Sequence, residues 1–172
     1  MIFIVNGAPG SGKTLFEETI REYSIIPIVL ISSVHFVKKI AMDCGWDGTK
    51  TAKNRKFLSD LKALLKEWDD VPFKSTVKEV RSALLYFKEE PVIFIDCREP
   101  EEIEKFCKEL GAKAILIRRE ITEAAFASNA SDDFTNILNY NYDYVIENNG
   151  SYEEFITKAI NFYKQITEKT SD

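Results

Sequence analysis

The fold of this chain is set by residues 1–14, which read M-I-F-I-V-N-G-A-P-G-S-G-K-T. Residues 2–6 are almost entirely apolar and run into glycines, which is typical of a central strand buried on both faces of a parallel sheet. A helix is expected next, over about residues 12–23. A buried strand joined to a helix by a glycine-rich loop predicts an α/β protein.

Short apolar runs alternate with helical periodicity along the rest of the chain, which indicates βαβ units and a parallel sheet. Polar residues 120–139 are only weakly periodic, which favours a mobile excursion over a core element. Thr76 with Glu79 and Ser151 with Glu154 are each spaced as a capping box, predicting helix starts at these positions. Further strands are predicted over residues 27–32, 91–96, 114–118 and 144–147, and further helices over residues 34–45, 51–68, 76–89, 100–110 and 151–166.

Length and composition predict one acidic domain over residues 1–172. The 172 residues carry 23 Lys plus Arg against 28 Asp plus Glu, a net charge of −5, and 45% are hydrophobic. The three cysteines show no C-x-x-C spacing, so we expect reduced, buried thiols rather than a disulfide framework or a zinc site. An acidic protein lacks the basic surplus that non-specific nucleic-acid binding needs, which argues against a general nucleic-acid role.

No segment predicts a membrane span. The longest strongly apolar stretch, residues 25–31, is far shorter than the ~20 residues that a spanning helix needs. The first residues lack the basic region of a signal peptide. We therefore expect a cytoplasmic protein with no membrane partner, and its oligomeric state stays open.

The strongest chemical signal is G-A-P-G-S-G-K-T, which matches the phosphate-loop pattern G-x-x-x-x-G-K-[ST] at every fixed position. Glycines let successive backbone N–H groups point inward as a nest for phosphate oxygens. The lysine reaches the β and γ phosphates, and the Thr14 hydroxyl ligates Mg²⁺. The predicted nucleotide-binding residues are Gly7, Ala8, Pro9, Gly10, Ser11, Gly12, Lys13 and Thr14.

Asp96, at the end of the predicted strand 91–96, is the expected acidic partner of Mg²⁺; the alternative is that it caps the next helix. Residues 96–99 read D-C-R-E, so Asp96 is followed by a cysteine and not by the glutamate with which a hydrolytic motor activates water. The chain also has no N-K-x-D motif and no L-S-G-G-Q motif. A GTPase switch and a transport ATPase are therefore disfavoured.

Three arginines lie where strands are predicted to end. Arg98 follows Asp96 by two residues, where a guanidinium could hold an acceptor phosphate. Arg118 and Arg119 end the fourth strand at the base of residues 120–139, where they could close over the phosphates and neutralise the transferring group. The alternative for this pair is solvent exposure or salt bridges with nearby glutamates.

With these motifs the sequence resembles the nucleoside monophosphate kinases, a group of phosphate-loop kinases, and most closely the phage-type deoxynucleoside monophosphate kinases. The resemblance rests on G-A-P-G-S-G-K-T, on I-D-C-R-E-P-E-E-I, on A-I-L-I-R-R and on Y-D-Y-V-I-E-N-N-G-S, which together cover about half of the chain. It implies a three-layer α/β/α P-loop NTPase fold with a five-stranded parallel sheet in the order 2-3-1-4-5. It further implies a helical acceptor-binding insert over residues 33–90 and a lid over residues 120–139.

Carried over to this chain, the resemblance implies ATP and Mg²⁺ at Lys13 and Thr14, the metal at Asp96, and the acceptor phosphate at Arg98. It places Arg118 and Arg119 in the lid and puts Asn148 and Gly150 in the turn near the adenine ring. The chain departs from the pattern in two ways. Residues 120–139 contain no further arginine, and S-S-V-H-F-V-K-K-I lacks the acidic residue that some small-molecule kinases place after the second strand.

Acceptor recognition is expected in the insert. Lys50, Lys53, Arg55 and Lys56 cluster there as candidate phosphate or base contacts, or as a solvated basic face. Trp46 could stack on a base, while His35 is expected to be structural or solvent-facing. The leading interpretation is transfer of the ATP γ-phosphate to a (deoxy)nucleoside monophosphate. A regulatory ATP-binding protein and a kinase of another small phosphorylated metabolite remain alternatives.

Overall fold

The described residues, 1–49, 51–127, 138 and 140–168, form a sheet of five parallel strands in this computed structural model. The strand order is β2-β3-β1-β4-β5, and each neighbouring pair is parallel, which confirms the expected topology. The strands are β1 (Ile2–Asn6), β2 (Ile28–Ser32), β3 (Val92–Asp96), β4 (Lys113–Arg118) and β5 (Tyr144–Glu147).

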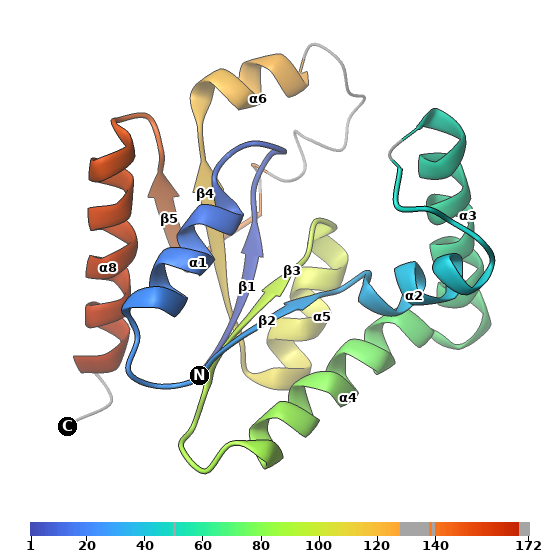
Figure 1. Ribbon diagram of the computed structural model, residues 1–172, viewed down its shortest axis with the longest axis horizontal. Helices are drawn as coiled ribbons and strands as arrows, with labels where there is room; N and C mark the ends of the chain where they lie inside the picture. Colours follow the sequence, from blue (N-terminus) through green and yellow to red (C-terminus); the bar gives the residue numbers. More distant parts are fainter. Residues whose placement is uncertain (50, 128–137, 139, 169–172) are drawn as a thin grey trace.

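Helices cover both faces of the sheet and make three layers (Figure 1). Helices α1 (Lys13–Tyr23) and α8 (Tyr152–Glu168) cover one face, while α4 (Val71–Tyr86) and α5 (Pro100–Leu110) cover the other. Because successive strand side chains point to opposite faces, Phe3 and Val5 of β1 join the first core and Ile4 joins the second. The strand is buried on both faces, as its continuous apolar run predicts.

Local signals set the ends of two helices as expected. Pro100 opens α5, and Gly111 follows its end with φ 62°. At the start of α8, the Ser151 N–H donates to Glu154 Oε2 at 2.8 Å, and the Glu154 N–H donates to Ser151 Oγ at 3.2 Å. The predicted capping box at Ser151 is therefore confirmed.

The connection from β2 to β3 is helical, with α2 (His35–Asp43), α3 (Ala52–Asp69) and α4, as expected. The predicted helix start at Thr76 is wrong. Thr76 lies inside α4, where its hydroxyl donates to the Pro72 carbonyl at 3.0 Å. The helix begins at Val71 because Asp70 adopts a left-handed conformation and Pro72 occupies the first turn.

Residues 120–127 form helix α6 (Glu120–Ala127), so the first part of the predicted mobile excursion is regular structure. The Arg119 carbonyl accepts hydrogen bonds from the N–H groups of Thr122 and Glu123, both at 3.0 Å, which starts the helix directly after β4. Residues 128–137 and 139 of that prediction lie outside the described residues. None of the helices formed by the described residues is long and apolar enough to cross a membrane.

Candidate functional site

The predicted functional residues gather at the carboxyl edge of the sheet. The loop of residues 7–12 follows β1, Asp96 ends β3, Arg118 ends β4 and Asn148 follows β5. In Figure 1 this loop lies beside α6, above the ends of β1 and β4. Parallel strands bring their carboxyl ends to one edge, where ligands of open α/β sheets bind.

Two glycines of the loop are required by close contacts. A Cβ at Gly7 would lie 2.3 Å from the Ile117 carbonyl oxygen, and a Cβ at Gly12 would lie 2.6 Å from Asn148 Nδ2. Gly12 also has φ 106°, a conformation that other residues rarely adopt. The loop is thus wedged against β4 on one side and against the turn after β5 on the other.

Lys13 is the first residue of α1, and its amine folds back over the loop. Its Nζ donates to the Gly7 carbonyl at 2.7 Å and to the Ala8 carbonyl at 3.2 Å. Burial lowers the pKa of Lys13, and Arg98 lowers it further, although Asp96 and Glu17 oppose the shift. The ammonium group is therefore held at the mouth of the loop by backbone oxygens.

Asp96 lies in the same electrostatic environment. Burial raises the pKa of its carboxyl, and the charges of Lys13, Arg98 and Lys38 oppose that rise. Its Oδ1 is buried and has no hydrogen-bond partner among the described residues. Asp96 does not cap α5, because the position before that helix is Glu99.

The donor set fits Mg²⁺. A buried carboxylate oxygen without a partner is costly unless a cation or a donor satisfies it. The Asp96 carboxylate and the exposed Thr14 hydroxyl offer the hard oxygen ligands that Mg²⁺ prefers. Ser11 Oγ, in the loop, is a second buried polar atom without a partner among the described residues.

The three arginines differ in their surroundings. Arg98 is exposed, and no ion pair of its guanidinium is found among the described residues, yet its charge acts on Lys13 and Asp96. Arg118 is held by Glu123 of α6, with Nε to Oε1 at 3.1 Å and Nη2 to Oε2 at 3.0 Å. This bidentate hydrogen bonding raises the pKa of Arg118. The pairing with Glu123 corresponds to the salt-bridge alternative for Arg118. Arg119 is exposed, which corresponds to the solvent-exposure alternative.

Asn148 supports the loop. Its side chain is buried, and its Nδ2 donates to the Ser11 carbonyl at 2.8 Å. Its backbone N–H donates to the Arg118 carbonyl at 2.7 Å, which joins β5 to the end of β4. The amide group of Asn148 therefore contacts loop backbone, and Gly150 lies in the following turn.

Sequence reasoning missed two residues beside this site. Glu17 of α1 is buried, and burial, with a further contribution from the charge of Asp96, raises its pKa to about 8. Asn6 is also buried; its Oδ1 accepts from the Gly7 N–H at 2.7 Å, and its Nδ2 donates to the Arg98 carbonyl at 3.1 Å. The available signal for Glu17 was its position one helical turn after Lys13.

Other candidates in the insert lie in less enclosed surroundings. Lys53 and Arg55 are exposed, Lys56 pairs with Asp60 at 2.7 Å, and Lys50 lies outside the described residues. Trp46 donates from Nε1 to the Thr49 carbonyl at 3.1 Å. His35 is exposed and lies 3.4 Å from a Glu79 carboxylate oxygen, in keeping with the solvent-facing alternative.

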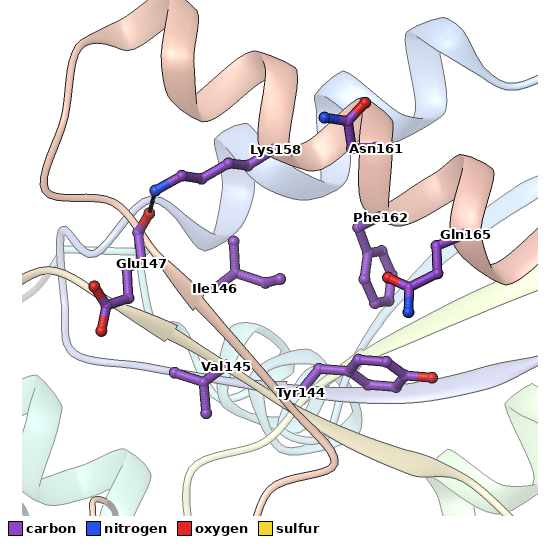
Figure 2. A pocket seen from close by; sticks show the side chains of 8 residues that line it. All are labelled: Tyr144, Val145, Ile146, Glu147, Lys158, Asn161, Phe162 and Gln165. Atoms are coloured by element: carbon purple, nitrogen blue, oxygen red, sulfur yellow. Dashed lines mark hydrogen bonds between the residues drawn. The ribbon is translucent and has the colours of Figure 1, made fainter.

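A groove of about 470 Å³ lies elsewhere, between β5 and α8 (Figure 2). Its lining includes Tyr144, Ile146 and Phe162. Lys158 of α8 contributes to it and donates to the Glu147 carbonyl at 2.7 Å. No residue of the loop 7–14 lines this groove, so we do not assign the groove to nucleotide binding. The candidate site is the loop together with the edge of the sheet beside Asp96.

Comparisons with known proteins support the fold. No protein-family model matches the chain, and no curated protein sequence matches it. Among solved structures, the fold is similar to a shikimate kinase from Aquifex aeolicus, with a TM-score of 0.59, 16% identity, and 96% of each chain covered. It is also similar to a dephospho-CoA kinase from Campylobacter jejuni, with a TM-score of 0.54, 18% identity and 98% of each chain covered. A gluconokinase from Sinorhizobium meliloti matches with a TM-score of 0.52 and 15% identity over 98% of this chain and 94% of that one. The chain therefore has the α/β fold found in these kinases.

Proposed function

We propose that this protein is an ATP-dependent phosphotransferase that moves the γ-phosphate of ATP to a (deoxy)nucleoside monophosphate. The observation that carries the proposal is the convergence of Lys13, Asp96 and Arg98 beside the glycine loop, with one Asp96 oxygen buried and unpartnered among the described residues. A protein that only bound ATP would need the loop but not a free arginine beside it.

In this proposal the loop binds the donor phosphates through its backbone N–H groups and the N-terminus of α1. Lys13 turns from the Gly7 and Ala8 carbonyls to the β and γ phosphates. Thr14 and Asp96 would hold Mg²⁺, which would neutralise charge on the phosphates. Buried Asn148 keeps the loop in shape through Ser11.

Arg98 is assigned to the acceptor phosphate, since it is exposed and its guanidinium has no ion pair among the described residues. An acceptor phosphate oxygen attacks the γ phosphorus while the bond from that phosphorus to the departing ADP oxygen breaks. The acceptor oxygen is already anionic, so no general base is required, and catalysis depends on positioning and charge neutralisation.

The flanking segments complete the assignment. We assign acceptor binding to the insert of residues 33–90, apart from its ion-paired side chains Lys62, Lys66 and Arg81, and we assign residues 120–139 to a lid. Arg119 is the arginine available to the lid, because Glu123 already holds Arg118. Arg118 would join the phosphates only if α6 moved and released it.

The test is ADP release with ATP, Mg²⁺ and each common (deoxy)nucleoside monophosphate. We expect Lys13→Met to lower transfer about 100- to 1,000-fold, the usual effect of removing one electrostatic donor. Arg98→Met should raise the acceptor KM about 10- to 100-fold, because a hydrogen bond to a charged group contributes ~1.5–3 kcal/mol. Arg81→Met is the matched control, since Arg81 pairs with Glu109 on the surface. ATP binding without stimulation by any acceptor would reject the proposal.

A second candidate function, transfer to a hydroxyl group of a small metabolite, is favoured by Glu17. An alcohol acceptor needs a base, and the stretch after β2 has no acidic residue for that role. Glu17 places a carboxyl group in the enclosed space near Asp96 and Lys13. The fold alone does not distinguish a nucleoside monophosphate acceptor from a hydroxylated metabolite, since a shikimate kinase has a similar fold. Turnover with a hydroxylated metabolite, lost in Glu17→Gln, would favour this candidate.

A further inference from the structure

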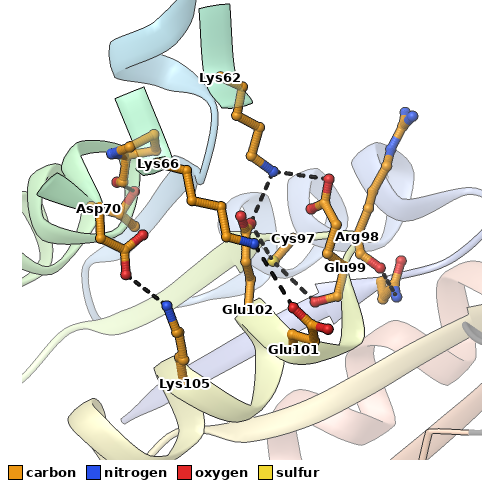
Figure 3. A network of polar contacts seen from close by, with 12 residues as sticks. Lys62, Lys66, Asp70, Cys97, Arg98, Glu99, Glu101, Glu102 and Lys105 are labelled. Carbon is orange, nitrogen blue, oxygen red and sulfur yellow. Dashed lines mark hydrogen bonds and ion pairs between the residues drawn. The ribbon is translucent and has the colours of Figure 1, made fainter. Parts of the chain in front are cut away.

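Helix α3 is joined to the segment after β3 by ion pairs rather than by a buried face. None of the residues 52–69, all of them described, is buried. Four lysine–carboxylate contacts, made by three lysines, cross from the α3 side to α5 and its start (Figure 3). They are Lys62 with Glu99 and Glu102, Lys66 with Glu101, and Lys105 of α5 with Asp70.

Lys62 is the enclosed member of this set. Its Nζ lies 2.9 Å from Glu99 Oε1 and 3.0 Å from Glu102 Oε2, and its side chain is 15% exposed. The Glu102 side chain is 9% exposed, and Cys97 Sγ approaches Glu102 Oε2 at 3.7 Å. By contrast, Lys66 Nζ lies 3.9 Å from Glu101, and those side chains are 39% and 88% exposed. Exposed pairs contribute little, whereas an enclosed pair that loses one partner leaves a costly buried charge.

The electrostatics of Lys62 agree with this geometry. Burial alone would lower the pKa of its amine, but the hydrogen bond that the amine donates to Glu99 and the charges of Glu99 and Glu102 outweigh burial and raise the pKa. Lys62 therefore remains an ammonium group, and it bridges two carboxylates from one turn of the chain. The Lys62 ammonium group thus holds both Glu99, the residue before α5, and Glu102, in the first turn of α5.

This bridge acts on the residue proposed to bind the acceptor. Glu99 directly follows Arg98, whose carbonyl accepts from Asn6 Nδ2 at 3.1 Å. Asn6 in turn accepts from the Gly7 N–H. The backbone of Arg98 is thus held from the loop side by Asn6 and from the insert side by Lys62 through Glu99.

We propose that Lys62 is a positioning residue, which holds the Arg98 segment in register with the phosphate loop by bridging Glu99 and Glu102. The inference rests on the proposed function, in which Arg98 binds the acceptor phosphate. It ties the placement of α3 to the acceptor site, because a shift of α3 moves the ammonium group that fixes Glu99. Lys62 itself touches neither substrate.

The test compares Lys62→Met with Lys66→Met, a matched loss of one lysine from the same helix. The acceptors are dAMP, dCMP, dGMP and dTMP, and KM is measured for acceptor and for ATP. We expect Lys62→Met to raise the acceptor KM about 10- to 100-fold, because misplacing a binding group by about 1 Å can cost as much as ~100-fold, while the KM for ATP stays within about twofold. Lys66→Met should leave both unchanged, and Lys62→Arg should restore part of the acceptor affinity.

Two further measurements keep the inference falsifiable. Lys62→Met leaves the Glu102 carboxylate buried without its cation, so the double variant Lys62→Met/Glu102→Gln removes that charge and protects the fold. If the folded double variant keeps the wild-type acceptor KM, the inference is overturned. Amide hydrogen exchange over residues 97–103 does not depend on turnover. Faster exchange in Lys62→Met than in Lys66→Met supports the positioning role, and equal exchange overturns it even if the wild type phosphorylates none of the four nucleotides.

Discussion

Replacing Gly12 by alanine tests the packing of the phosphate loop most directly. The added Cβ would lie 2.6 Å from Asn148 Nδ2, a distance that real Cβ contacts essentially never show, and 3.1 Å from Phe155 Cε1, which is tighter than most real contacts. Its φ of 106° adds a conformational cost of ~1–2 kcal/mol for an L-residue. Overpacking of a closed site adds ~1–3 kcal/mol, so we expect a loss of about 2–5 kcal/mol in the free energy of unfolding.

Gly48→Ala is the matched control. Gly48 also has a positive φ, 85°, but a Cβ there meets no atom within 4 Å. It therefore carries the conformational cost without the clash. Guanidinium unfolding of both variants isolates the packing contribution, and the melting temperature of Gly12→Ala should lie about 3–10 °C below that of Gly48→Ala.

A second comparison identifies the clashing atom. In an Asn148→Ala background the nearest contact is gone, so Gly12→Ala should cost less stability there than it does in the wild type, although Phe155 remains close. ATP binding should fall in Gly12→Ala and stay at the wild-type level in Gly48→Ala. Equal stability of Gly12→Ala and Gly48→Ala would refute the packing argument.

Three further predictions concern other parts of the structure. The pKa of Glu17 is raised to about 8 from an ordinary value of 4.5, so its contribution to stability is complete below pH 4.5 and is lost as the pH rises toward 8. Urea unfolding between pH 5 and 9 should therefore show a loss of stability with rising pH in the wild type that is absent in Glu17→Gln. Parallel stability profiles of the two proteins would contradict this prediction. Cys97 is buried, as expected, which raises the pKa of its thiol, whereas Cys44 is exposed, so the expectation of buried thiols is wrong for Cys44. A thiol reagent at pH 8 should label Cys44 in the folded protein and Cys97 only after unfolding, as peptide mass mapping would reveal. Ser151→Ala removes the capping hydrogen bond of α8 and should destabilise the protein by ~1 kcal/mol in chemical denaturation. The control Ser82→Ala, at an exposed position within α4, should change stability by less than ~0.5 kcal/mol. Equal effects of the two substitutions would argue against a stabilising cap at Ser151.

The sheet and most helices could be predicted because their signals are local. Each central strand is a continuous apolar run, and α5 is bounded by Pro100 and Gly111. The start of α4 was missed, since Thr76 and Glu79 imitate a capping box within a helix that a left-handed Asp70 had already begun. The competing signal was Pro72, which favours the first turn of a helix.

The candidate site was predictable only in part, because only some of its residues belong to local sequence patterns. The loop of residues 7–14 is one contiguous motif, and Asp96 and Arg98 follow a recognisable strand. The pairing of Arg118 with Glu123 depends on α6 beginning directly after β4, at a segment whose weak periodicity did not predict a helix. Asn148 gives a different case, because its buried contact with Ser11 joins residues far apart in the chain.

By itself, the amino-acid sequence determined the class of fold, the glycine loop and the residue types at the carboxyl edge, since these depend on short-range patterns of polarity and backbone freedom. Only the tertiary structure decided which of those groups are paired and which are free. It enclosed Glu17 beside Asp96, tied Arg118 to α6 and set Lys62 between Glu99 and Glu102. Burial and charge pairing arise from contacts between distant segments, and no local pattern encodes them.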